Sequence, residues 1–192
     1  MTDSYYDLSV ALLHEKMVDK QNKLITASLT LIDLHDLARS SRTYGLKHCF
    51  ISHPSPAMRK LARTLKVHWE EGYGATYNPN RKDALETVEL VSDLDEAIQQ
   101  IDRRCGQLPK LIATSARSGG AQRVSFETLR QEIFSHPKQP YLLMLGTGWG
   151  MSDELLARAD FFLEPINGPT AYNHLSVRSA GAIMFDRLLS PR

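Results

Sequence analysis

Cysteine is scarce in this sequence, and its two copies belong to no recognisable motif. Cys49 and Cys105 form no CxxC pair and have no metal-like spacing to a histidine. Isolated cysteines of this kind are typically reduced and mostly buried, and disulfides are rare in the cytosol. We therefore expect a cytoplasmic protein that is not held together by disulfides.

Long apolar runs and an excess of one charge are also missing. The longest aliphatic run, residues 142–145, is far short of the roughly 20 residues that span a bilayer. The N-terminus carries acids and tyrosines where a secretion signal needs a basic start and an apolar stretch. Twenty-three Lys and Arg residues against 22 Asp and Glu give a net charge of +1. We expect no membrane contact, and any nucleic acid must bind through local basic patches.

Neither internal repeats nor low-complexity tracts interrupt the 192 residues, which predicts a single domain over residues 1–192. Apolar stretches alternate with stretches of helical periodicity, as in an α/β fold with a mostly parallel sheet flanked by helices. Strands are predicted at residues 8–14, 24–31, 47–52, 87–91, 110–114, 141–145 and 161–163. Helices are predicted at residues 33–44, 56–66, 94–101, 126–134, 152–159 and 172–189. Residues 72–80 are expected to form an extended or looped insert.

A glycine-rich loop at residues 146–150 follows the apolar stretch 141–145. Its glycines allow backbone to approach a ligand at the carboxyl end of a sheet, although a tight strand–helix turn explains them equally well. Met151 stands where the dinucleotide fingerprint GxGxxG needs its third glycine. Asp153 and Glu154 follow at the start of a predicted helix, where they would repel a phosphate. The loop therefore favours a ligand without phosphate, and positive charge on that ligand would fit.

A second loop of small residues, 114–120, follows another apolar stretch and offers hydroxyl groups and Arg117. In a parallel sheet both loops lie at the same edge, where they can form a pocket.

Two stretches of the chain are locally basic. Residues 103–123 contain five basic and no acidic side chains, and Arg59, Arg63 and Lys66 share one face of a predicted helix. Such patches suit a polyanion, and an ordinary solvated surface is the alternative.

His35, Arg39 and Arg42 share one face of the predicted helix 33–44, and Asp33 lies at its start. The cluster could hold a substrate phosphate or move a proton. The alternative is structural, because acids are favoured at a helix start and can pair with nearby arginines. The remaining histidines lack metal-binding spacings, so no metal site is predicted.

Taken in chain order, these segments resemble the SPOUT superfamily of S-adenosylmethionine-dependent RNA methyltransferases, over nearly the whole chain. The most specific matches are LMLGTGWG at 143–150, LEPI at 163–166 and YNHLSVRSA at 172–180. They are similar to small, single-domain bacterial proteins often labelled tRNA guanine-N1 methyltransferase-like. Residues 33–45 resemble the first motif of the 2′-O-methylating branch, with Asp33 in place of that branch's asparagine.

The resemblance implies a C-terminal trefoil knot, S-adenosylmethionine as cofactor, and tRNA or rRNA as partner, with guanine N1 among the candidate target atoms. It also implies a homodimer in which the N-terminal helix of one subunit completes the RNA site of the other. The cofactor is expected to contact Thr114, Ser115, Leu145, Gly146, Thr147, Gly148, Trp149, Gly150, Glu164, Pro165, Ile166, Asn173, His174, Leu175 and Ser176. Arg39 matches the family's active-site arginine, and the other candidates to assist catalysis are Asp33, His35, Arg117 and Asn173.

Two other functions stay open on the sequence. A dimeric protein of the same fold could bind RNA or S-adenosylmethionine without turnover. A nucleotide-dependent oxidoreductase is a third reading, which Met151 and the acidic helix start argue against.

Overall fold

The computed structural model describes residues 6–115 and 122–191. Its strands are β1 (Asp7–Leu13), β2 (Met17–Val18), β3 (Leu24–Ile25), β4 (Cys49–Ser52), β5 (Val88–Val91), β6 (Lys110–Ala113), β7 (Arg123–Val124), β8 (Pro140–Gly146) and β9 (Phe161–Leu163). Seven of them form one sheet in the order β5-β4-β1-β8-β6-β9-β7, and every neighbouring pair in it is parallel. Strands β2 and β3 form a separate antiparallel hairpin. The predicted mostly parallel sheet is confirmed.

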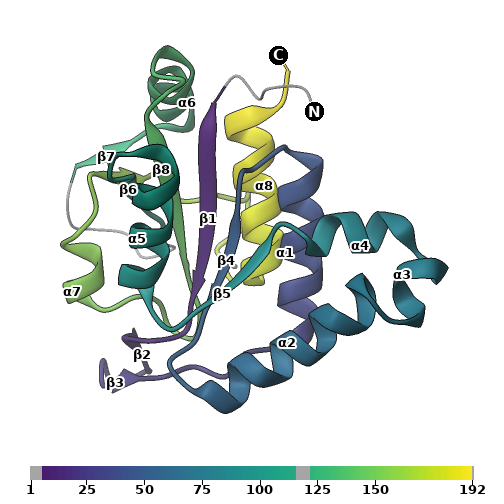
Figure 1. Ribbon diagram of the computed structural model, residues 1–192. Coiled ribbons are helices and arrows are strands. Elements are labelled where there is room, and N and C mark those ends of the chain that lie inside the picture. Colours follow the sequence, from purple (N-terminus) through teal and green to yellow (C-terminus); the bar gives the residue numbers. More distant parts are fainter. Residues whose placement is uncertain (1–5, 116–121, 192) are drawn as a thin grey trace.

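Helices cover both faces of this sheet (Figure 1). They are α1 (Leu31–Thr43), α2 (Pro56–Glu70), α3 (Tyr73–Tyr77), α4 (Pro79–Leu85), α5 (Leu94–Cys105), α6 (Phe126–Ser135), α7 (Asp153–Leu156) and α8 (Val177–Leu189). Helices α1 and α8 pack against each other on one face, and α5 lies on the other. None of the helices in the described residues combines the length and apolar character of a membrane span.

The side chains of the inner strand β1 show why both faces of the sheet pack against helices. Its side chains alternate between two apolar clusters, with Leu8, Val10 and Leu12 in one and Ala11 and Leu13 in the other. All five are fully buried, as expected for a parallel strand between two helical layers. The trefoil knot remains a prediction.

The insert at residues 72–80 was expected to be extended or looped, and this prediction is wrong, because the segment forms α3 and the start of α4. Asn78 caps α4, its side chain accepting from the Arg81 backbone N–H, and Pro79 occupies the first turn. Asparagine followed by proline is a helix start as readily as a loop signal.

Three further expectations need correction. Only Leu24–Ile25 of the predicted strand 24–31 is a strand. The last helix begins at Val177 rather than at residue 172, because Ser176 caps it. Both cysteines are free, but only Cys49 is buried, whereas Cys105 is exposed at the end of α5.

Candidate functional site

The carboxyl ends of β8, β6 and β9 lie side by side because these strands are parallel neighbours in the sheet. The Thr114 hydroxyl donates to the Met144 carbonyl oxygen at 2.8 Å, which ties β6 to β8. The Arg123 guanidinium donates to the carbonyl oxygens of Ser115 and Leu163 at 3.4 and 3.2 Å, which ties β6 to β9. From the sequence alone, Arg123 is only one of the five basic residues in the stretch 103–123. In the structure it holds two of the predicted cofactor loops together.

The glycine loop after β8 is bonded to the segment around β2. The Val18 backbone N–H donates to the Gly150 carbonyl oxygen at 2.9 Å, and the Trp149 N–H donates to the Val18 carbonyl oxygen at 3.2 Å. The Thr147 hydroxyl donates to the Leu13 carbonyl oxygen at 3.0 Å. The N-terminal part of the chain therefore sets the shape of this loop.

Backbone geometry and close packing explain the three glycines. Gly148 and Gly150 have φ angles of +60° and +108°, which side-chain-bearing residues rarely adopt. A Cβ atom on Gly146 would lie 2.9 Å from Met151 Cγ. Met151 is itself buried against the loop. A dinucleotide site needs its third glycine at position 151, but this chain has Met151 there, and the Met151 side chain packs against the loop.

The described basic side chains at this edge each have a contact within the chain. Lys16 Nζ lies 2.7 Å from Glu154 Oε1, and Lys20 Nζ lies 5.3 Å from the centre of the Trp149 ring. Arg123 donates to two carbonyl oxygens, whereas Lys16 pairs with the opposite charge of Glu154. Asp153 and Glu154 line a cavity of about 310 Å³ beside the glycine loop, together with residues of β2 and β3 and Met151.

The segment between β9 and α8 contributes the remaining predicted cofactor residues. Glu164 Oε1 accepts from the Phe126 N–H at 2.8 Å, so this carboxylate also fixes the start of α6. Ile166 packs on the core, while Leu175 is 47% exposed. Pro165 lies between Glu164 and Ile166, and Asn173 and His174 lie outside the helix.

Asp33 is held by a residue that the sequence analysis did not select. Arg178 of α8 places Nη1 2.9 Å from Asp33 Oδ1 and Nε 3.2 Å from Asp36 Oδ2. The Thr30 hydroxyl also donates to Asp33. Arg178 belongs to the YNHLSVRSA motif, which was the available signal for it. The ion pair joins the start of α1 to the start of α8.

The other predicted catalytic residues do not gather around Asp33. The His35 ring packs edge-on against Trp69 of α2, with ring centres 5.8 Å apart. Burial, followed by the nearby Arg81 charge, lowers the His35 pKa. Arg39 is exposed and forms no ion pair with another described side chain, whereas Arg42 pairs with Asp83 at 2.8 Å. Arg117 lies outside the described residues.

A buried polar cluster at the end of β1 also escaped the sequence analysis. His14 Nδ1 lies 2.8 Å from the Ser52 carbonyl oxygen, and its buried Nε2 has no partner among the described residues. Glu15 accepts from the Ser52 hydroxyl at 2.7 Å and from the Leu94 N–H at 3.0 Å. Burial lowers the pKa of His14 and raises that of Glu15. Polar residues directly after a buried strand were the signal for this cluster.

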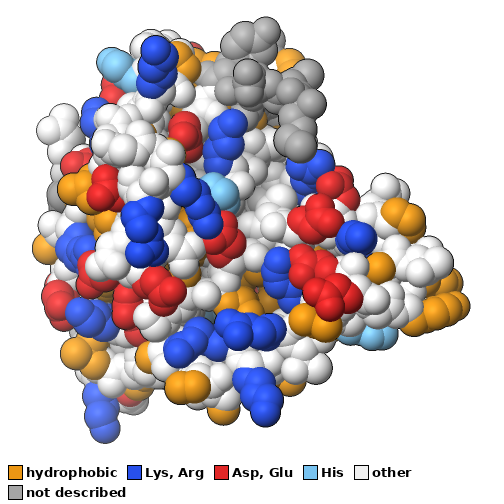
Figure 2. Space-filling view, viewed as in Figure 1, with side chains coloured by type: hydrophobic (Ala, Val, Ile, Leu, Met, Phe, Trp, Pro, Cys, Tyr) orange, Lys and Arg blue, Asp and Glu red, His pale blue; other side chains and the backbone are white. Residues whose placement is uncertain are grey.

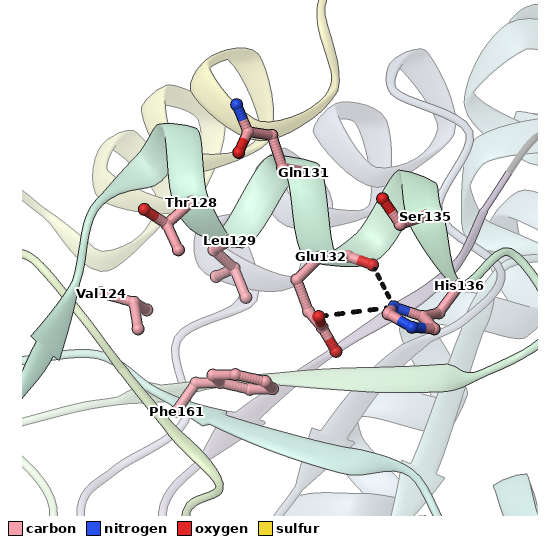
Figure 3. A pocket seen from close by; sticks show the side chains of 8 residues that line it. All are labelled: Val124, Thr128, Leu129, Gln131, Glu132, Ser135, His136 and Phe161. Carbon is pink, nitrogen blue, oxygen red and sulfur yellow. Dashed lines mark hydrogen bonds and ion pairs between the residues drawn. The ribbon is translucent and has the colours of Figure 1, made fainter.

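A further cavity, of about 290 Å³, lies between α6 and the first residue of β9 (Figure 3). Phe161 forms one wall, and Glu132 of α6 lies beside His136, the residue that follows the helix. Glu132 also pairs with Lys110 at 2.9 Å, which lowers the pKa of the Glu132 carboxyl. Lys110 and Phe161 begin their strands, so this cavity is mainly at the opposite end of the sheet from the cofactor loops.

Curated proteins include relatives of this chain. A curated relative from Oleidesulfovibrio alaskensis, named tRNA (guanine-N(1)-)-methyltransferase, is 44% identical over 183 residues, which cover 95% of this chain. The chain spans only 42% of the length of that relative. An uncharacterized protein from Aquifex aeolicus is 39% identical, and the match covers 94% of this chain and 87% of that protein.

A solved structure shares the fold at low identity. The SpoU methyltransferase AviRb from Streptomyces viridochromogenes, in complex with the cofactor AdoMet, matches with a TM-score of 0.54 and 12% identity. The match covers 96% of this chain and 59% of AviRb. At this identity the likeness concerns the fold, including the parallel sheet and its helical layers. The family described as SAM-dependent RNA methyltransferase matches residues 7–190, nearly the whole chain, and the protein belongs to that family.

Proposed function

We propose that this chain binds S-adenosylmethionine at the carboxyl ends of β6, β8 and β9 and transfers its methyl group to a nucleotide of RNA. The observation that carries the proposal is the meeting of three strand ends and the segment before α8 at one edge of the sheet. A dinucleotide would instead need a third glycine at position 151, where Met151 packs against Gly146.

When bound, S-adenosylmethionine supplies a methyl group on a positively charged sulfur. In the proposal, the main chain at Leu145, Ile166 and Leu175 receives the adenine, since a flat ring needs an apolar surface and hydrogen bonds to peptide groups. Glu164 is the predicted acid of this edge, and an acid stabilises a nearby cation. Catalysis then consists mainly of holding the acceptor atom in line with the methyl group.

A base nitrogen or ribose hydroxyl must also lose a proton when it is methylated. Among the proposed residues, Asp33 is engaged by Arg178 and His35 packs on Trp69. Arg39 is the described candidate with the most open side chain. We assign Arg39 to orienting the RNA, with Asn173 and Arg117 as further candidates at the reacting atoms.

The finer parts of the proposal follow the relatives. Because the chain spans less than half of the relative named tRNA (guanine-N(1)-)-methyltransferase, that substrate and atom are proposals for this chain. We further propose that the protein is cytoplasmic and a homodimer, in which Arg39 of one subunit reaches the RNA site of the other.

Calorimetric titration with S-adenosylmethionine and S-adenosylhomocysteine, with NAD as control, tests the cofactor. We expect saturable binding of the adenosyl ligands at about one per subunit and none of NAD. Transfer of labelled methyl groups to bulk tRNA, followed by digestion and mass spectrometry, then identifies the methylated atom. Binding without transfer to any RNA would instead support the non-catalytic binding protein.

Leu175→Asp sharpens this test. Leu175 is 47% exposed, so the variant should fold, yet it places a charge where the adenine is proposed to lie. We expect at least a tenfold loss of S-adenosylmethionine affinity. Leu108→Asp is the matched control, because Leu108 is 64% exposed and lies just before β6, at the opposite end of the sheet. Equal affinities for both variants would move the adenine site elsewhere.

A further inference from the structure

Helices α2, α3 and α4 connect β4 to β5 and project from the body of the protein (Figure 1). Helix α2 begins four residues after the end of β4, at the carboxyl edge of the sheet that carries the candidate site. Its 15 residues extend about 22 Å at 1.5 Å per residue. The projection therefore leads away from the proposed methylation site.

The outer face of α2 carries two unpaired cations. Lys60 and Arg63 are exposed and form no ion pair with a described residue. Arg59 instead donates to the His53 and Pro54 carbonyl oxygens at 2.6 and 2.8 Å, and Lys66 pairs with Glu70 at 2.6 Å. The predicted basic face of Arg59, Arg63 and Lys66 is thus replaced by Lys60 and Arg63. Figure 2 shows basic side chains in a band along this helix.

Two tyrosines stand exposed at the far end of the projection. Tyr73 and Tyr77 of α3 are 77% and 73% exposed, and their rings stack with centres 6.0 Å apart and planes 24° apart. Figure 2 shows hydrophobic side chains gathered at this end. Beneath them, a Cβ atom on Gly74 would lie 2.6 Å from the Trp69 ring, so α3 packs tightly on α2. The two tyrosines therefore lie on a short helix that is held in place by its packing on α2.

This combination matches the chemistry of RNA with unpaired bases. Exposed aromatic faces receive bases by stacking, whatever the base, and cations beside them contact phosphates. The length of α2 corresponds to roughly six stacked nucleotides at 3.4 Å each. Two acids of the projection, Glu70 and Asp83, pair with Lys66 and Arg42, whereas Glu71, between α2 and α3, is exposed and forms no ion pair with a described residue.

We propose that the projection formed by α2, α3 and α4 holds the RNA substrate several nucleotides away from the reacting one. Lys60 and Arg63 contact its phosphates, and an unpaired base stacks on Tyr73 and Tyr77. This inference rests on the proposed function, because it takes RNA to be the substrate.

The test measures binding of labelled bulk tRNA to the full chain by fluorescence anisotropy. The double variant Tyr73→Ala, Tyr77→Ala should weaken binding by roughly 5-fold to 150-fold, the equivalent of 1–3 kcal/mol of stacking per base. The matched variant Tyr73→Phe, Tyr77→Phe keeps both ring faces and should bind within about twofold of wild type. Binding of S-adenosylmethionine should be unchanged in both.

The cations are tested separately through salt. Lys60→Ala with Arg63→Ala should reduce the slope of log affinity against log salt by roughly 1.4–1.8, at 0.7–0.9 per lost phosphate contact. Lys47→Ala with Lys138→Ala is the control, since these exposed lysines precede β4 and β8 at the opposite end of the sheet. The control slope should match that of wild type.

Different failures have different meanings. If wild type binds tRNA and both alanine pairs bind equally well, the inference is overturned while the proposed function stands. If wild type neither binds nor methylates any RNA offered, the proposed function fails and the inference fails with it. If the tyrosine variant instead loses self-association in sedimentation, the rings face a second copy of the chain, which also overturns the inference.

Discussion

Replacing Arg178 by Gln would leave the Asp33 carboxylate with the Thr30 hydroxyl as its remaining described partner. The broken contact joins atoms 2.9 Å apart, and the Asp33 and Arg178 side chains are 12% and 33% exposed. A hydrogen bond to a charged group contributes about 1.5–3 kcal/mol, and breaking a fully buried ion pair costs about 3–5 kcal/mol. Because water reaches a third of Arg178, we expect a loss of about 1.5–3 kcal/mol in the free energy of unfolding.

Urea unfolding followed by circular dichroism measures this loss. In a chain of this size, 1 kcal/mol lowers Tm by roughly 2–4 °C, so Arg178→Gln should melt about 3–12 °C below wild type. Combining it with Asp33→Asn should cost less than the sum of the two single changes, because the second change removes the stranded charge. The expected coupling energy is about 0.5–3 kcal/mol.

Arg42→Gln is the matched control, since it makes the same substitution in an ion pair that is about half exposed on both sides. Exposed pairs contribute about 0.2–1 kcal/mol. If Arg178→Gln cost no more than Arg42→Gln, or if Asp33→Asn had the same effect with and without Arg178, the pair would not join α1 to α8 as described.

Three further predictions concern activity, packing and pH. Arg39→Ala should abolish methyl transfer to RNA while leaving the affinity for S-adenosylmethionine unchanged, whereas Arg42→Ala should keep methyl transfer. Equal methyl transfer by the two variants would show that the active site does not include Arg39. Gly181→Ala should lower the free energy of unfolding by about 0–2 kcal/mol in urea unfolding. Its Cβ would lie 2.8 Å from Leu37 Cδ2, and this overpacking costs about 1–3 kcal/mol, whereas the better helix propensity of alanine contributes about 1 kcal/mol of stability. A variant more stable than wild type would contradict this prediction. Burial lowers the His14 pKa, so the folded state binds this proton less readily than the unfolded state. The unfolding free energy should therefore fall as pH drops below about 6.5, and His14→Gln should flatten that fall; an unchanged pH profile would refute the assignment.

The sheet was predictable because a parallel strand buried on both faces appears as a short, nearly continuous apolar run. Residues 8–14 and 141–145 are such runs, and they became the two central strands. The predicted bounds of helices and loops were wrong where a polar residue or proline is compatible with more than one kind of local structure. Asn78 and Pro79 start a helix as well as a loop, and Ser176 delays the last helix by capping it.

The candidate site was predictable only as far as strand ends and motifs go. Periodicity shows that Arg178 lies on a helix, but its partner Asp33 is 145 positions away, and only the packing of α1 on α8 brings the two together. Likewise, nothing in the sequence distinguishes Arg123, which bonds carbonyl oxygens, from Lys60, which is free to contact a ligand. His14 contacts Ser52 at the end of β4 and His53 after it, and this packing was equally hidden in the sequence.

The central position of β1 has a consequence for synthesis on the ribosome. Its neighbour β4 emerges soon after it, but its other neighbour, β8, begins at Pro140, 127 residues beyond Leu13. At 5–20 residues per second, roughly 6–25 s pass before that partner exists. Throughout this interval one edge of β1, five of whose residues are apolar, has unpaired backbone groups. An unpaired strand edge can associate with another chain, so slower translation between β1 and β8 should increase aggregation of the nascent chain.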